Sequence, residues 1–310
     1  MGILSRFGNY VLASRARAII SVLVFGFLPL LGWVSSVILA LVTLRKGALE
    51  GLWVLVWVLI PTSIFQFALG YTHLAWFSFL GGPVFIWAMA LVLRRFASWT
   101  MVLELTALYG LLIVLGVHLL VPDIAGWWAH YYESALSGIS QTAASSSSGD
   151  AQTAQNVAGM LEQPDIVAFI TKLATGTVAI MTLLFSLVNL ALGRFWQALL
   201  FNPRGLRPEL TNVRLGYIAS GVLLVLGALA YGQFPLAWDL LPIMIGVFVA
   251  ASLSVLHALL GKTKLALAWL ILVYVLLVVL SPYSVLAIIL VGIVDSFVNL
   301  RERFKPAALK

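Results

Sequence analysis

The chain has 310 residues, of which 62% are hydrophobic and only 9% are charged, and its formal net charge is +7. The hydrophobic share lies far above the roughly 45–50% of soluble domains, and the mean hydropathy is +1.08, so an ordinary soluble protein is excluded. The chain contains no cysteine, which excludes disulfides, thiolate catalysis and cysteine-ligated metals.

Long apolar runs follow one another along the chain, and several reach the roughly 20 residues that cross a hydrocarbon core. The short segments of alternating polarity that are typical of membrane β-barrels do not occur. We therefore predict an all-α fold: a polytopic transmembrane helix bundle with about eight full spans plus a short N-terminal hairpin or re-entrant pair, in a single membrane domain over 1–310. The expected helices are 18–30, 31–44, 48–70, 73–93, 97–121, 166–192, 214–232, 235–260, 265–280 and 283–299.

Positive charge is confined to alternate connections between these helices. One set of connections holds seventeen of the eighteen Lys and Arg residues, and the other set holds none; Lys172 lies inside a helix. Because cytoplasmic loops carry the excess of Lys and Arg, we expect both termini in the cytoplasm of a bacterium, with the chain in the inner membrane. The uncharged set, expected outside, is formed by 71–72, 122–165, 233–239 and 281–282.

The N-terminal arginines also decide how the first two runs are interpreted. They precede an apolar run that continues past any plausible cleavage site, so we expect this segment to remain in the mature chain. Arg17 and Arg45 share a side only if 18–44 enters and returns, and these 27 residues are too few for two full spans at about 1.5 Å per residue. A break at Pro29 and Gly32 would give two short helices. The alternative is one long tilted helix with the N-terminus outside.

The external segment 122–165 divides into two parts. Its first part carries Trp127, Trp128, Tyr131 and Tyr132, and such rings favour the headgroup region, so we predict an interfacial aromatic helix. It would be either a membrane belt or a lid over an outward-facing cavity. The second part is Ser-rich, lacks apolar anchors and is predicted to be disordered.

Glu104 and Lys172 lie about two turns inside their expected helices, where each is a candidate site because burying a charge in the membrane is costly. Glu104 and Lys172 differ in depth by roughly 10–15 Å on a simple helical rise, so a direct pair is not expected. Lys172 can extend its stem outward, whereas Glu104 needs a partner, for example Arg94 or Arg95. We predict Glu104, Lys172, Trp127, Trp128 and Tyr131 as ligand or coupling residues.

A polar island, Arg194–Arg214, interrupts the apolar pattern with four arginines and one glutamate. Asn202-Pro203 ends the preceding helix, Gly205 allows a tight turn, and Pro208 can open the next helix. We therefore predict a cytoplasmic polar loop over 194–213. Membrane anchoring explains its charge, but its uncharged polar groups suggest a partner site, for which the candidates are Arg194, Gln197, Asn202, Pro203, Arg204, Gly205, Arg207, Glu209 and Arg214.

Asp295 lies one turn before the end of the last expected helix, with Asn299 and Arg301 following it. A carboxylate is disfavoured at a helix C-terminus, so we expect a cation of the polar island, from Arg204, Arg207 or Arg214, to compensate it. The alternative is a solvated helix end. Asp295, Asn299 and Arg301 complete the predicted partner-binding motif.

The remaining residue types exclude several functions. No two histidines occur at the i, i+3 or i+4 spacing of a helical metal site, and His118 with Asp123 is a weak ligand pair across Pro122. There is no nucleophile elbow, phosphate loop or dinucleotide fingerprint. We therefore expect no metal, no cofactor and no catalytic constellation. Four arginines are also too few for a nucleic-acid track.

The polar island and two other segments resemble a known family. The island reads RFWQALLFNPRGLRPEL, which resembles the RWWQALLYNPGGF…E signature of the YybS-like family of bacterial polytopic membrane proteins; RKGALEG at 45–51 and DSFVNLRERF at 295–304 also agree. Arg204 departs from the glycine of that signature. The family is distantly similar to S-components of energy-coupling-factor transporters, which implies an outward-facing ligand site, separate ATPase and coupling subunits, and a small-residue coupling surface at Ser14 and Ala18.

Three functions remain open at this point. The first is small-molecule binding or uptake of S-component type, with the ligand entering from the external side. The second is a non-transporting scaffold or regulatory partner that docks a cytosolic or membrane protein, or anionic lipid, through the polar island. The third is an intramembrane enzyme, which would need Glu104 to converge with His257 or Asp295.

Overall fold

The computed structural model describes residues 2–28, 30–68, 80–145, 159, 163–203, 205–263 and 265–304, and within these ranges every regular element is a helix. Four helices are long and apolar enough to cross a membrane: α4 (Ala48–Ala68), α7 (Trp99–Leu120), α10 (Pro164–Phe201) and α13 (Pro235–Leu260). The shorter apolar helices are α12 (Tyr217–Tyr231), α14 (Ala266–Val279) and α15 (Tyr283–Val298). The chain is therefore a helical membrane protein, as its composition predicts.

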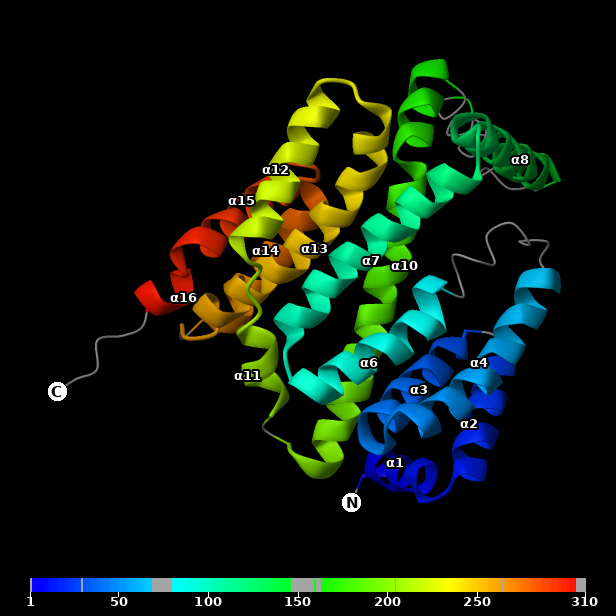
Figure 1. Cartoon of the computed structure of the whole chain (residues 1–310), viewed down its shortest axis with the longest axis vertical. Coiled ribbons are helices and arrows are strands. Elements are labelled where there is room, and N and C mark those ends of the chain that lie inside the picture. The colour runs from blue at the N-terminus through cyan, green and yellow to red at the C-terminus, as the bar shows by residue number, and fades with distance from the viewer. Residues whose placement is uncertain are drawn as a thin grey trace.

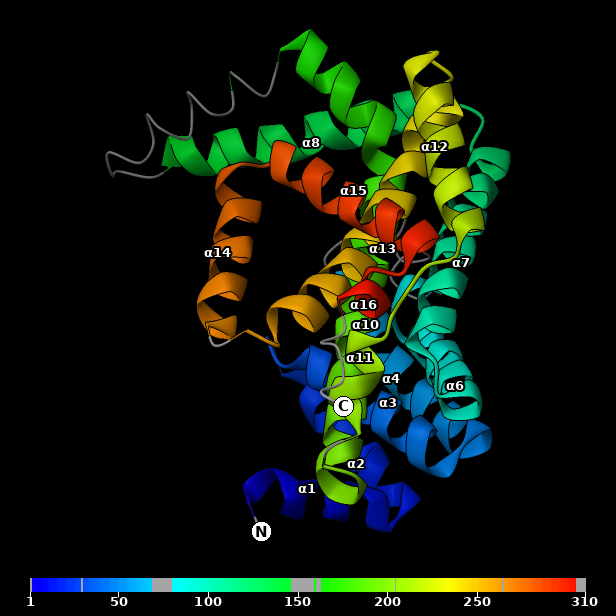
Figure 2. The same ribbon diagram turned by 90° about the vertical axis from the view of Figure 1, so that its left-hand side faces the viewer.

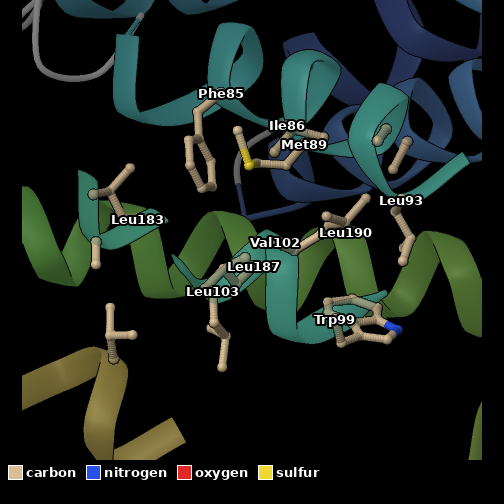
Figure 3. Close-up of a cluster of buried hydrophobic side chains, with 14 of the residues drawn as sticks. Phe85, Ile86, Met89, Leu93, Trp99, Val102, Leu103, Leu183, Leu187 and Leu190 are labelled. Carbon is tan, nitrogen blue, oxygen red and sulfur yellow. The ribbon is translucent and has the colours of Figure 1, made fainter. Parts of the chain in front are cut away.

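Helix α10 is the axis of the bundle. Figure 1 shows it running the full height of the molecule, with α2, α3, α4 and α6 on one side and α12, α13 and α15 on the other. It contacts α3, α7 and α13, and its side chains Leu183 and Leu190 are fully buried. Figure 3 shows these leucines against Phe85 of α6 and Leu103 of α7, so one apolar core joins both halves of the chain.

Small residues let α10 approach its neighbours closely, as is common where membrane helices pack. A Cβ atom at Gly176 would lie 1.7 Å from the carbonyl oxygen of Asp239 on α13. A Cβ atom at Gly193 would lie 3.1 Å from the carbonyl oxygen of Val37 on α3. The two halves of the bundle therefore meet α10 through main-chain contact at its two ends.

The N-terminal apolar stretch is two helices and not one. Following α1 (Ile3–Ala13), helices α2 (Arg15–Phe27) and α3 (Gly32–Lys46) pack against each other. The hydroxyl of Ser35 donates a hydrogen bond to the carbonyl of Val22 across the pair, at 2.7 Å. Of the predicted break point, Gly32 begins α3, while Pro29 lies outside the described residues.

The helix expected over 73–93 is described only from residue 80 onward, and its described part is interrupted. A short irregular turn, η1 (Leu80–Val84), precedes α6 (Phe85–Phe96), and Gly82 has the non-helical angles φ −95° and ψ −113°. Pro83 contributes to the break because it has no N–H to donate. The hydroxyl of Ser186 donates to the freed carbonyl of Gly81 at 2.6 Å, so α10 holds the broken helix in place.

The aromatic segment forms a helix, α8 (Ile124–Ser145). Figure 2 shows α8 lying across one end of the bundle, at a steep angle to α10. The Ser-rich segment predicted to be disordered, 141–156, begins inside α8, which continues to Ser145. Its remaining residues, 146–156, lie outside the described ranges, as do Arg204 and 305–310.

The polar island is more helical than expected. Helix α10 continues to Phe201, and α11 (Leu206–Thr211) begins two residues before Pro208, which is possible because N–H groups in a first helical turn need no acceptor inside the helix. Helix α12 begins at Tyr217 and not at Arg214. The chain then ends with α15 and the short α16 (Leu300–Arg303).

Candidate functional site

The first half of the polar island is held together by its own charges. Arg194, on α10, forms an ion pair with Glu209 of α11 and also donates to Gln197 Oε1 at 3.3 Å. Asn202 ends α10, and a Cβ atom at Gly205 would lie 2.4 Å from its side-chain nitrogen. These groups therefore shape the turn between α10 and α11, and their polar atoms are largely used within it.

The second half of the polar island meets Asp295, but through main-chain atoms. Arg214 Nε and Nη2 donate to the carbonyls of Asp295 and Ser296, each at 2.9 Å, which places a cation at the C-terminus of α15 where the helix dipole favours it. The Asp295 carboxylate itself pairs with Arg301 at 2.7 Å. The compensating cation for that carboxylate therefore comes from α16 and not from the polar island.

Arg301 is the centre of this network. Its Nη2 atom donates to the carbonyl of Val213 at 2.5 Å and to Ser254 Oγ at 3.1 Å. Burial lowers the pKa of Arg301, and the adjacent Asp295 carboxylate opposes that shift. Asn299, with φ 49°, provides the left-handed turn between α15 and α16 that brings Arg301 back onto Asp295. The predicted trio therefore joins α13, α15 and the polar island.

Arg207 differs from the other arginines of the polar island that the structure describes. It is exposed, and its guanidinium makes no hydrogen bond or ion pair within the described residues, whereas Arg194 and Arg214 both have partners. Arg204, the neighbouring arginine of the polar island, lies outside the described residues.

The two intramembrane candidates are on exposed faces of their helices. Glu104 accepts a hydrogen bond from the main-chain N–H of Gly216 at 3.3 Å, so its partner is the first turn of α12 and neither Arg94 nor Arg95. Lys172 faces outward on α10. The structure does not bring Glu104 and Lys172 into one site.

The aromatic candidates of α8 stack on one another and against the bundle. The rings of Trp127 and Tyr131 are stacked with centroids 6.1 Å apart. Trp128 is buried and donates from its indole Nε1 to Thr175 Oγ1 on α10 at 2.8 Å. At this point α8 is therefore bound to α10.

Beneath Trp128 lies a buried polar cluster that the sequence does not reveal. His118 Nε2, near the end of α7, lies 3.4 Å from Asp239 Oδ2 on α13, and the side chain of Asp239 is 4% exposed. The main-chain N–H of Gly176 donates to the same carboxylate at 3.2 Å, and Thr175 also contacts it. The cluster therefore joins α7, α8, α10 and α13 at one end of the bundle.

Pro235 is the first residue of α13, as predicted, at a position that proline favours. Asp239 therefore lies in the second turn of this helix, although 233–239 was also expected to be an external connection. Asp123, the weak ligand partner that the sequence suggests for His118, accepts a hydrogen bond from Gly126 N–H at the start of α8. The pairing of His118 with Asp239 depends on helices distant in sequence, so no local spacing encodes it.

A cavity of about 330 Å³ lies where α2, α3, α4, η1 and α10 meet. Its wall is mixed, with apolar side chains such as Trp33 and Phe185, and we call it the polar cavity for the hydroxyl and amide groups that also line it. Its wall includes Gly82 of the broken helix and Gly32 at the start of α3, and none of its described lining residues is charged. The polar lining side chains include Ser35, Ser36, Thr62, Thr182, Ser186 and Asn189.

Most of these polar groups keep some hydrogen-bonding capacity. Thr62 and Thr182 donate to carbonyls one turn earlier, which leaves their oxygen lone pairs available as acceptors. Asn189 uses one N–H on the carbonyl of Phe185, at 3.0 Å, and Ser36 makes no hydrogen bond within the described residues. The cavity can therefore both accept from and donate to a small polar molecule.

The residues considered for catalysis have separate partners. Glu104 bonds to Gly216, His257 Nδ1 lies 2.8 Å from the carbonyl of Leu253, and Asp295 pairs with Arg301. Across the ranges that the structure describes, no three His, Asp or Glu side chains cluster as metal ligands would.

Comparison of the chain with protein-family models, with curated proteins and with solved structures finds no match. The fold and the site define a helical membrane protein with a polar cavity beside a broken helix.

Proposed function

We propose that this protein binds a small, uncharged polar molecule within the membrane and takes part in its uptake. The observation that carries the proposal is the polar cavity between the α2–α3 pair, the broken helix at Gly82 and α10. Hydroxyl and amide groups in a membrane interior need polar partners, and a shared cavity lets one ligand supply them.

The surrounding backbone supports this interpretation. Helices α2 and α3 have 13 and 15 residues, so each rises only about 20 Å in a hydrocarbon core of about 30 Å. We propose that they form a re-entrant pair whose turn lies at mid-depth. Irregular backbone at membrane depth occurs where it lines a cavity, and interrupted helices form substrate sites in many transporters.

The charge pattern adds an orientation to the proposal. From it we propose that both termini and the polar island lie in the cytoplasm and α8 on the outer face, in a bundle of about eight full spans in a bacterial inner membrane. The ligand would then enter from the side of α8. The resemblance to the YybS-like family and to S-components agrees with this direction, and active uptake would require separate ATPase and coupling subunits.

Two features are less favourable to the expected partner surfaces. Ala18 is 1% exposed and Ser14 caps α2 by accepting from Arg17 N–H, so this pair offers little free coupling surface. Arg194 and Arg214 of the polar island are engaged inside the protein. Among the arginines of the polar island that the structure describes, Arg207 is the one left free to dock a cytosolic protein.

The test compares two variants of α10 in a ligand screen. Asn189→Leu places an apolar group in the cavity, whereas Met181→Leu changes an exposed position that does not line it. Purified protein is heated with a panel of sugars, nucleosides, vitamins and neutral amino acids. We expect at least one compound to raise the melting temperature of the native protein and of Met181→Leu but not of Asn189→Leu. Equal stabilisation of all three, or of none, would contradict the proposal.

A further inference from the structure

A second cavity, of about 780 Å³, lies between α7, α10, α11, α13 and α14 and shares no lining residue with the polar cavity. We call it the apolar cavity because its wall is mostly leucine, valine and alanine, for example Leu187, Val249 and Leu270. On one side it is bounded by α14, none of whose residues is buried. In Figure 2, α14 stands away from the rest of the bundle.

The apolar cavity has the length of a lipid chain. Its wall follows α10 from Leu184 to Leu199, a rise of about 22 Å at about 1.5 Å per residue. One leaflet of a bilayer has a hydrocarbon depth of about 15 Å, half of the 30 Å core. A single acyl chain therefore fits lengthwise in the apolar cavity, which an ordinary compact metabolite would not fill.

Polar groups lie at the polar-island end of the apolar cavity. Arg207 is the only charged residue among its described lining residues, and within the described residues its guanidinium has no partner. The lining includes no carboxylate that would bind the ammonium group of a zwitterionic headgroup. The charge at this end therefore favours an anion.

Trp99 supplies a second, independent indication of a ligand. It lines the apolar cavity and is 5% exposed, and its buried indole Nε1 has no hydrogen-bond partner. Figure 3 shows its ring beside α10 with the nitrogen turned away from Leu103. A buried N–H without a partner is unfavourable, and an ester or phosphate oxygen of a lipid would supply that partner.

We infer that the apolar cavity binds one anionic phospholipid, with an acyl chain along α10 and its phosphate on Arg207. Trp99 Nε1 donates to an ester or phosphate oxygen of the same lipid. This inference does not depend on the polar cavity or on transport.

The test measures lipid retention by native mass spectrometry after adding phosphatidylglycerol or phosphatidylcholine with identical chains. We expect the native protein to retain phosphatidylglycerol about fivefold better, the ratio that corresponds to about 1 kcal/mol per basic residue near a membrane surface. Arg207→Ala should abolish this preference and Arg207→Lys should keep most of it. Arg303→Ala, at an exposed arginine outside the apolar cavity, should leave it unchanged.

Further variants and a competitor distinguish a bound lipid from other occupants of the apolar cavity. Ala250→Phe, which fills the apolar cavity, should reduce retention of both lipids, and Trp99→Phe should weaken retention while keeping the ring. Glycerol phosphate should not displace the lipid. Equal retention of the two lipids by the native protein, a preference that survives Arg207→Ala, or displacement by glycerol phosphate would overturn the inference.

Melting temperatures identify any variant that fails to fold. Arg207→Ala changes an exposed side chain, so it keeps the test decisive if a cavity variant does not fold.

Discussion

At the scale of single residues, the polar side chains of this protein mostly hold helices together. Arg301 connects the carboxylate of Asp295, the carbonyl of Val213 and the hydroxyl of Ser254, while Arg214 caps the end of α15. The Asp295 side chain is 2% exposed. Removing one member of a buried ion pair lowers the stability of the fold by more than the intact pair contributes to it, because the remaining charge stays buried without a partner.

We therefore predict that Arg301→Ala lowers the free energy of unfolding by about 3–5 kcal/mol, measured by denaturant titration in mild detergent. Arg303→Ala, two residues away and exposed, should change it little. The double variant Asp295→Asn/Arg301→Ala should be less destabilised than the sum of its parts, because the uncompensated charge is gone. Additive losses would show that the pair is not energetically coupled.

At the scale of helices, the structure depends on close approach at a few glycines. Helices α10 and α13 meet at Gly176 and Asp239, directly below the contact between Trp128 and Thr175 that secures α8. The contact between α10 and α13 also brings Asp239 to the buried His118–Asp239 cluster. Close helix packing and polar contacts therefore occur at the same place.

Gly176→Ala should destabilise the protein clearly, because the added Cβ atom would lie 1.7 Å from a main-chain oxygen that no side-chain rotation can move. Gly227→Ala is the matched control: it lies inside α12 with nothing within 4 Å of the added atom, and alanine is favoured over glycine in a helix by up to about 1 kcal/mol. We expect a lower melting temperature only for Gly176→Ala. A similar response of both variants would exclude close packing as the cause.

At the scale of the whole molecule, the class and most helix positions could be predicted from the length and order of the apolar runs. The break between α2 and α3, the aromatic helix α8 and the helical start at Pro235 all have local signals in Gly32, in the Trp–Tyr cluster and in the proline itself. The pairing of His118 with Asp239, the choice of Arg301 over the polar island as partner of Asp295, and both cavities could not be predicted. These features depend on which helices become neighbours, and that information is not local in the sequence.

The polar cavity should be accessible to small solutes within the membrane domain. The natural absence of cysteine allows a direct measurement, because Ser36→Cys creates a single thiol in the wall of that cavity. In intact bilayers, a small water-soluble thiosulfonate should label Ser36→Cys but not Met181→Cys, which lies on an exposed apolar face of α10. Labelling should be slowed by any compound that stabilises the native protein. Failure to label Ser36→Cys, or equal labelling of the two positions, would contradict the claim.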